Sequence, residues 1–68
     1  MEHEEGLVIS AGPKHGFIRP VGKPDRIFWL SDAPPGLKKL RSVRYQVLPQ
    51  PDKPHDRAVN IELIPVAA

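Results

Sequence analysis

Prolines break this chain into short segments along most of its length. Nine prolines and five glycines are spread over the 68 residues as punctuation between short apolar stretches, not gathered in one tract. A proline inside a helix removes a backbone hydrogen bond and clashes with the preceding turn. The pattern therefore excludes a helical bundle and a low-complexity sequence. A chain of this length has room for one small domain with a compact core.

Between these breaks, five segments have the composition of β-strands. They are short and mostly apolar, with β-branched and aromatic residues, and one of them alternates apolar and polar side chains cleanly. The expected strands cover residues 6–11, 15–19, 26–31, 42–48 and 58–64. The sequence predicts an all-β protein, a small five-stranded antiparallel barrel, because closure of the sheet removes exposed edges.

The remaining segments are expected to be loops and tails. Residues 37–41 have helix-like spacing but are too few for an independent helix, so we expect a loop or at most one short helical turn near residues 36–41. Residues 1–5 carry three glutamates and no cation, and are expected to form a flexible acidic tail. The barrel would then comprise residues 6–65, followed by a C-terminal tail at 66–68.

The strand pattern also predicts which side chains face the core. The expected core residues are Val8, Ile18, Ile27, Trp29, Val43, Tyr45, Val47, Val59, Ile61 and Leu63. The period of two in a strand then places Phe17, Phe28 and His15 on the outer face. Outward rings indicate a surface that stacks on nucleic-acid bases, unless they pack under a loop or the faces are inverted. If Trp29 faced outward instead, it would add a ring to this surface.

The charge distribution favours an anionic partner or simply a soluble surface. From residue 6 onward there are ten Lys and Arg residues against five Asp and Glu residues, a formal charge of +5. A basic surface on so small a domain is typical of proteins that bind polyanions. Solvated surface charge accounts for the same numbers, so composition leaves both interpretations open.

Several classes of function lack support in the sequence. There is no cysteine, which excludes disulfides and thiolate metal sites and fits a cytoplasmic protein. The three histidines lack the paired spacing of a zinc site, the serines lack an activating motif, and no glycine-rich phosphate loop occurs. We therefore expect no enzyme activity, no metal, no cofactor, no small-molecule substrate and no membrane association.

The order of short motifs along the chain resembles that of a cold-shock domain. The motifs are Gly6-x-Val8, His15-Gly16-Phe17-Ile18, Asp25-x-Ile27-Phe28, Val43-x-Tyr45-x-Val47 and Ala58-Val59-Asn60-Ile61. The second is similar to the family's first ribonucleoprotein motif, Lys-Gly-Phe-Gly-Phe-Ile, and the third to its second, Val-Phe-Val-His-Phe. The resemblance runs from about residue 6 to residue 64. It implies a five-stranded OB-fold barrel that binds single-stranded RNA or DNA.

The resemblance also implies a set of binding residues. Phe17, Phe28 and His15 would stack on bases, while cations beside them would hold phosphates. The expected phosphate-binding residues are Lys14, Arg19, Arg26 and Lys38. The chain departs from the family in its first strand, where residues 9–11 carry no ring, and at Leu30, which aligns with the family's histidine. We therefore expect weak binding with little sequence preference.

A second interpretation keeps the barrel but gives it a protein partner in place of a nucleic acid. The missing first-strand rings and Leu30 favour a protein-interaction module that has lost much of its stacking face. Its contact would lie in the basic loop 37–44 or in the proline-rich loop 49–54. A third reading places the barrel in a larger assembly, where basic loops matter more than rings.

Overall fold

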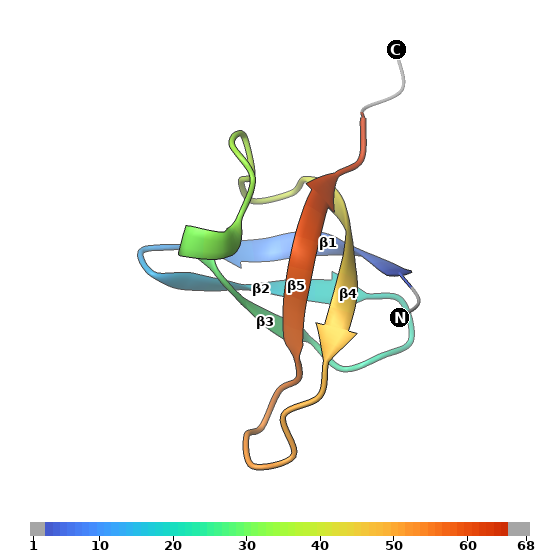
Figure 1. Ribbon diagram of the computed structural model, residues 1–68. Coiled ribbons are helices and arrows are strands. Elements are labelled where there is room, and N and C mark those ends of the chain that lie inside the picture. Colours follow the sequence, from blue (N-terminus) through green and yellow to red (C-terminus); the bar gives the residue numbers. More distant parts are fainter. Residues whose placement is uncertain (1–2, 66–68) are drawn as a thin grey trace.

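Five strands form a closed barrel in a computed structural model, which describes residues 3–65 (Figure 1). The strands are β1 (His3–Ala11), β2 (His15–Pro20), β3 (Arg26–Trp29), β4 (Ser42–Leu48) and β5 (Arg57–Leu63). They follow the order β1-β2-β3-β5-β4, and β4 pairs with β1 to close the barrel. The predicted fold class, an all-β five-stranded barrel of the OB type, is confirmed.

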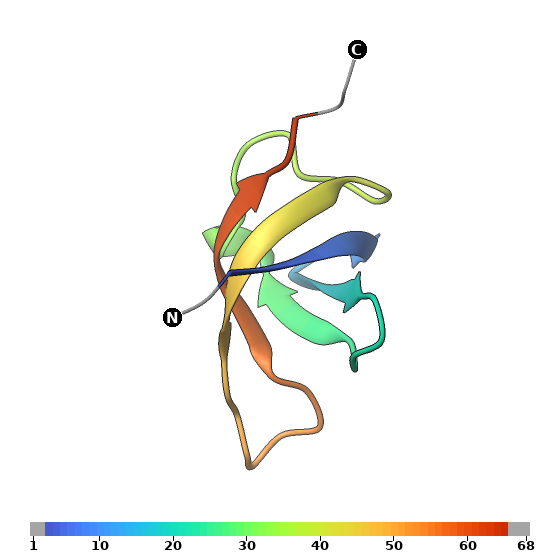
Figure 2. The ribbon, with the colours of Figure 1, turned by 90° about the vertical axis from the view of Figure 1, so that its right-hand side faces the viewer.

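The pairing of the strands brings the outer face of the β2–β3 hairpin next to the base of the β4–β5 loop. β1 pairs with β4 through its first half and with β2 through its second half. β2 pairs with β3 in an antiparallel hairpin, whereas β3 and β5 run parallel where Ile27 meets Arg57. Figure 2 shows β1 between β4 and β2, and the β4–β5 loop extending away from the barrel. The outer face of the β2–β3 hairpin therefore lies next to the base of that long loop.

Some element boundaries differ from the prediction. Residues 3–5, which we expected in an acidic tail, belong to β1 and pair with β4. β3 ends at Trp29, and a short 3-10 turn, η1 (Leu30–Asp32), replaces the end of the predicted strand. Residues 36–41 form a loop with turns and no helical turn, which agrees with the loop interpretation of that segment. The outer parts of the predicted tails, residues 1–2 and 66–68, lie outside the described residues.

The core is small and almost entirely aliphatic and aromatic. Its buried residues are Val8, Ile18, Phe28, Val43, Tyr45, Ala58 and Ile61. Five partly buried apolar residues pack against this cluster, namely Leu30, Ala33, Leu37, Val47 and Leu63. Most of the predicted core positions are therefore correct, and the exceptions fall in β3 and β5.

The two faces of β3 are opposite to the prediction. Phe28 has no exposed surface, whereas Trp29 is 38% exposed and Ile27 is half-buried. Gly16 lies opposite Phe28 in the hairpin, and a Cβ atom on Gly16 would lie 2.7 Å from Cζ of the Phe28 ring. The ring fills the space that the glycine leaves open. The expectations that Phe28 stacks on bases and that Trp29 and Ile27 fill the core are therefore wrong.

A β-bulge shifts the pattern in β5. Arg44 pairs with Glu62 and Gln46 with Val59, so one residue of β4 faces two residues of β5. Asn60, in the bulge, has a φ of 53°, a left-handed conformation that asparagine tolerates better than most residues. The extra residue brings both Ala58 and Ile61 into the core and leaves Val59 half-buried, contrary to the predicted alternation.

Polar and charged side chains of β1, the β2–β3 turn, β3, β4 and the β4–β5 loop form a group that we call the Glu4 cluster: Glu4, Lys23, Arg26, Tyr45 and Asp56. The Glu4 carboxylate accepts hydrogen bonds from the Tyr45 hydroxyl at 2.7 Å and from Arg26 Nε and Lys23 Nζ at 3.0 Å each. Burial acts to raise the pKa of Glu4, but these three donors outweigh it and lower the pKa from 4.5 to about 2. These contacts of the partly buried Glu4 carboxylate help to hold residues 3–5 in the barrel.

Candidate nucleic-acid interface

Side chains of the β2–β3 hairpin gather three rings on its outer face. In the hairpin register His15 lies opposite Trp29, and Phe17 lies opposite Ile27. All four side chains point away from the core, because their neighbours Gly16, Ile18 and Phe28 are buried. His15 and Trp29 are exposed, while Phe17 is half-buried. The predicted outer positions of His15 and Phe17 are therefore correct, and Trp29 takes the place expected for Phe28.

The β4–β5 loop adds a fourth ring to this face. The rings of His55 and Phe17 have centroids 5.1 Å apart, those of Phe17 and His15 are 5.9 Å apart, and those of His15 and Trp29 are 5.6 Å apart. We call these four residues the ring strip. Each pair meets edge to face, with planes inclined at 64° to 85°. In this arrangement the edge of one ring meets the face of the next, and the exposed side chains of His15 and Trp29 are the most accessible of the four.

His55 is fixed in one orientation by the backbone of the neighbouring turn. Its Nδ1 atom lies 3.2 Å from the carbonyl oxygen of Asp25, which only accepts hydrogen bonds. Nδ1–H is therefore the donor in this hydrogen bond. Sequence reasoning missed His55, because only the folded structure brings residue 55 next to residue 17.

The two arginines expected to hold phosphates are engaged with carboxylates. Arg19 donates to both carboxylate oxygens of Asp25, at 3.0 and 3.4 Å, and these bonds lower the pKa of Asp25. Arg26 is only 12% exposed and donates to Glu4 and to Asp56. Arg19 stays at the surface beside the hairpin, whereas Arg26 belongs to the Glu4 cluster. The expectation that Arg26 faces a phosphate is wrong.

Lysines supply the cations around the ring strip. Lys14 lies in the β1–β2 turn, where it lines a surface hollow together with Trp29. Lys53, in the β4–β5 loop, lines a pocket with Trp29 and His55. Neither lysine forms an ion pair with any residue in the range 3–65. Lys14 was predicted as a binding residue, whereas Lys53 was not, because its distance from the hairpin in sequence gave no signal.

The basic loop 37–44 lies away from this face. Figure 1 shows the loop that follows η1 at one end of the barrel and the β4–β5 loop at the other. The predicted binding residue Lys38 is exposed in this loop, and so is its neighbour Lys39. Arg44 pairs with Glu62 at 3.3 Å across the strands. Lys38 is therefore remote from the β4–β5 loop end of the ring strip, and it would require a separate contact with an extended ligand.

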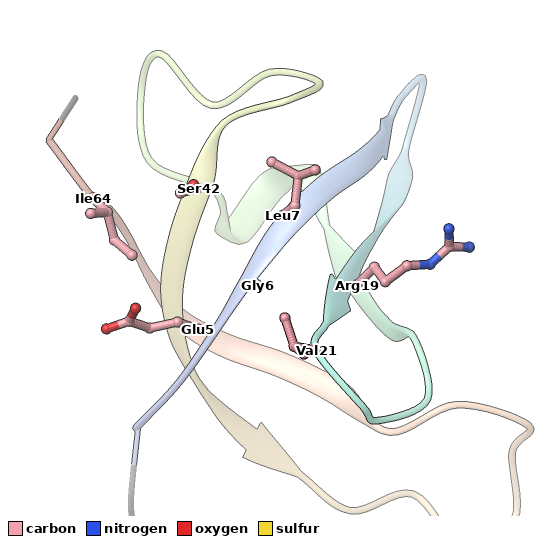
Figure 3. A pocket seen from close by; sticks show the side chains of 7 residues that line it. All are labelled: Glu5, Gly6, Leu7, Arg19, Val21, Ser42 and Ile64. Atoms are coloured by element: carbon pink, nitrogen blue, oxygen red, sulfur yellow. The ribbon is translucent and has the colours of Figure 1, made fainter. Parts of the chain in front are cut away.

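A second concave surface lies over β1 and the β2–β3 turn. It has a volume of about 250 Å³, and Figure 3 shows Leu7, Arg19 and Val21 around it, with Glu5 on the other side of β1. Leu7 is 38% exposed and Val21 is 97% exposed, so the surface is apolar. Its cation among the described lining residues, Arg19, is already paired with Asp25. This surface suits an apolar partner better than a polyanion.

Comparisons with known proteins add no family assignment. Neither models of known protein families nor curated proteins match the sequence. Within residues 3–65, no group of three His, Asp or Glu side chains is arranged to hold a metal ion. No helix in the described part of the chain is long and apolar enough to span a membrane. The features that bear on function are the ring strip, the cations beside it and the barrel that carries them.

Proposed function

We propose that the protein binds single-stranded RNA or DNA through the ring strip, with Lys14 and Lys53 contacting the phosphates. The observation that carries this proposal is the set of three edge-to-face contacts that aligns four rings on one open surface. Aromatic side chains beside cations are the features that bind single strands without reading their sequence. The bases of a duplex are stacked on one another, so they offer no face to such rings.

The barrel supports the same proposal. OB-fold barrels bind oligonucleotides and oligosaccharides on the face of their second and third strands and with adjacent loops. Here the ring strip occupies that face and includes a residue of the β4–β5 loop. The inverted faces of β3 also shift the resemblance to cold-shock domains by one residue, because Ile27 and Trp29 take the outer places of that family's Phe and His. Trp29 then restores one of the rings that the sequence had lost.

Weak binding with little sequence preference is the expected behaviour. Residues 9–11 of β1 contribute no ring, so fewer bases stack than on a full platform. Each base that stacks on an aromatic side chain contributes roughly 1–3 kcal/mol. Three or four rings, two of them histidines, therefore give a modest stacking energy, to which the lysines add an electrostatic part.

The direct test is titration with short oligothymidine and oligouridine strands. Trp29 is the single tryptophan of the chain and lies in the ring strip, so its fluorescence should be quenched as bases stack. Phe17→Ala should weaken binding by about 1–3 kcal/mol without unfolding the barrel, since Phe17 is outside the core. Leu40→Ala is the matched control, because Leu40 is 68% exposed and lies in the basic loop. Equal affinity in the parent and the folded Phe17→Ala variant would contradict the proposal.

Salt dependence separates stacking from bare charge attraction. For single strands, the logarithm of affinity falls with the logarithm of salt by about 0.7 per neutralised phosphate, so Lys14 and Lys53 predict a slope of about −1.4. Stacking is barely screened by salt, so part of the binding should persist at high salt and be weaker in the Phe17→Ala variant. Binding that disappears completely at high salt in the parent protein would show that charge alone is at work.

One observation favours protein binding as a second candidate function. Leu40 has a φ of 73° and is 68% exposed between Lys39 and Arg41 of the basic loop. Its backbone N–H donates to the Val8 carbonyl at 2.8 Å, so the barrel holds this apolar side chain at the surface. A partner with an apolar patch inside an acidic rim would fit the loop. Absence of strand binding at low salt would make this the leading function, with Lys38, Lys39 and Leu40 as the first residues to replace.

A further inference from the structure

The concave surface over β1 and the β2–β3 turn has an apolar centre between two charged side chains. We call it the β1 patch and define it by Glu5, Leu7, Arg19, Val21 and Ile64. Leu7 and Val21 are exposed, and the half-buried Ile64 lines the same hollow. Single apolar side chains are common on protein surfaces, whereas several that gather around a hollow indicate an interaction site.

Strand pairing fixes the arrangement of the side chains in the β1 patch. Leu7 lies opposite Arg19 of β2 and, on the other side of β1, opposite Ser42 of β4. Glu5 precedes Leu7 by two residues in the same strand, so both side chains leave the same face of β1. Three paired strands therefore carry the patch. A partner can dock on it without first ordering a loop, which lowers the free-energy cost of association.

The two charges lie on opposite sides of the patch, and both have hydrogen-bonding capacity to spare. Figure 3 shows the side chains of Glu5 and Arg19 extending away from each other on either side of Leu7. Glu5 forms no ion pair with any residue in the range 3–65. Arg19 uses Nε and Nη2 on Asp25, which leaves the Nη1 group without a partner in that range. The patch thus offers an acceptor on one side and a donor on the other.

A surface with this layout is complementary to itself. In a twofold dimer the same patch of each copy forms the interface. When the axis lies in the interface at right angles to the line between Glu5 and Arg19, Glu5 of each copy faces Arg19 of the other. The same rotation brings the apolar centres, with Leu7 and Val21, against each other. A second copy of the chain therefore matches both the charges and the apolar centre.

We propose that two copies of the chain associate through the β1 patch as a weak twofold dimer. The proposal is independent of the proposed function, since no residue of the ring strip belongs to the patch. Seven residues line the hollow, whereas a stable interface uses about 20–30 residues on each side. The dimer therefore belongs to the weak, transient class and forms only as the protein is concentrated.

Sedimentation of the free protein at several concentrations is the first test. The parent should be mainly monomeric at about 10 μM and mainly dimeric at about 1 mM, with a dissociation constant on the order of 100 μM. Val21→Gln should weaken association about tenfold or more without disturbing the core, because Val21 is 97% exposed and each dimer loses two such side chains. Leu48→Gln is the matched control, since Leu48 is also exposed but lies at the opposite end of β4 from Ser42. It should leave the dissociation constant unchanged.

Exchange of the two charges tests how the copies are oriented. Glu5→Lys places two cations together at each contact, and Arg19→Glu places two anions together. Each variant should weaken the dimer about threefold or more, because the contact occurs twice in every dimer. The double variant brings opposite charges together again and should recover most of the parent's affinity. Thermal melts at low concentration verify that the barrel is intact in each variant.

NMR spectra identify the surface that associates. The signals of Leu7, Val21 and Ile64 should shift as the parent is concentrated. A parent that stays monomeric at about 1 mM, or a dimer that Val21→Gln leaves unchanged, would overturn the proposal. So would shifts confined to the ring strip or the basic loop, and so would a double charge variant that recovers no affinity. None of these measurements includes nucleic acid, so their failure leaves the proposed function standing.

Discussion

Replacing Glu4 by glutamine should destabilise the barrel far more than its place near the chain end suggests. The substitution keeps the size of the side chain and removes the negative charge that Arg26, Lys23 and Tyr45 share. Arg26, only 12% exposed, is then left with Asp56 at 3.4 Å as its carboxylate partner. A buried cation that loses its main partner strongly destabilises a fold.

The size of the effect follows from the pKa of Glu4. A fall from 4.5 to about 2 spans 2.5 units, and at about 1.4 kcal/mol per unit the ionised carboxylate contributes up to about 3 kcal/mol. A domain of this length has a total free energy of unfolding of roughly 3–10 kcal/mol. For so small a domain, each kcal/mol shifts the melting temperature by about 4–8 °C. Glu4→Gln should therefore lower the melting temperature by roughly 10–20 °C.

Acid provides an independent measurement of the same interaction. Because the folded state lowers the pKa of Glu4, the stabilisation is complete above pH 4.5 and is lost as the pH falls towards 2. Urea unfolding of the parent at pH 7 and at pH 3 should show this loss, and Glu4→Gln should show much less of it. Glu5→Gln is the matched control, since Glu5 is the residue next to Glu4 and is exposed. Equal melting temperatures for the two variants would refute the reasoning.

Six further substitutions, taken in three pairs, test the fold and the ring strip. Gly16→Ala should lower the free energy of unfolding in urea by several kcal/mol, because its Cβ would lie 2.1 Å from a backbone oxygen. Gly22→Ala has open space around it, so it should lower that free energy by only about 1 kcal/mol, the cost of its positive φ. Asn60→Gly should be nearly neutral and Asn60→Val should destabilise by about 1–2 kcal/mol, as measured by thermal melts. Phe28→Ala should cost about 3–5 kcal/mol of stability, while Trp29→Ala should reduce strand affinity and leave the melting temperature nearly unchanged.

Local signals in the sequence were sufficient to predict the strands and the closed barrel. Proline and glycine breaks and the alternation in 42–48 predicted five strands, because both act over neighbouring residues. The faces of β3 depend on a contact between strands, and Phe28 turns inward because Gly16 on β2 leaves room for its ring. The alternation of side chains along β3 alone contains no information about the space beside Gly16 on the neighbouring strand.

The candidate site shows the same division between local and long-range information. His15 and Phe17 were found because they follow one another at a spacing of two in a single strand. His55 and Lys53 were not found, since only the pairing of β3 with β5 brings their loop beside the hairpin. Arg26 was misassigned because its partner Glu4 lies 22 residues earlier, in a segment that looked like an acidic tail.

Most cations within residues 3–65 fall into two groups; the exceptions are Lys23, which pairs with Glu4, and Arg41, which forms no ion pair in that range. Within residues 3–65, the arginines that donate to carboxylates are Arg19, Arg26, Arg44 and Arg57. The lysines without an ion-pair partner in that range are Lys14, Lys38, Lys39 and Lys53. Arginine is the residue that binds phosphates and bases in a fixed geometry, whereas lysine acts as a mobile point charge. On the proposed function, most cations available to a strand are therefore lysines, which set no defined register, so selectivity would come mainly from the rings.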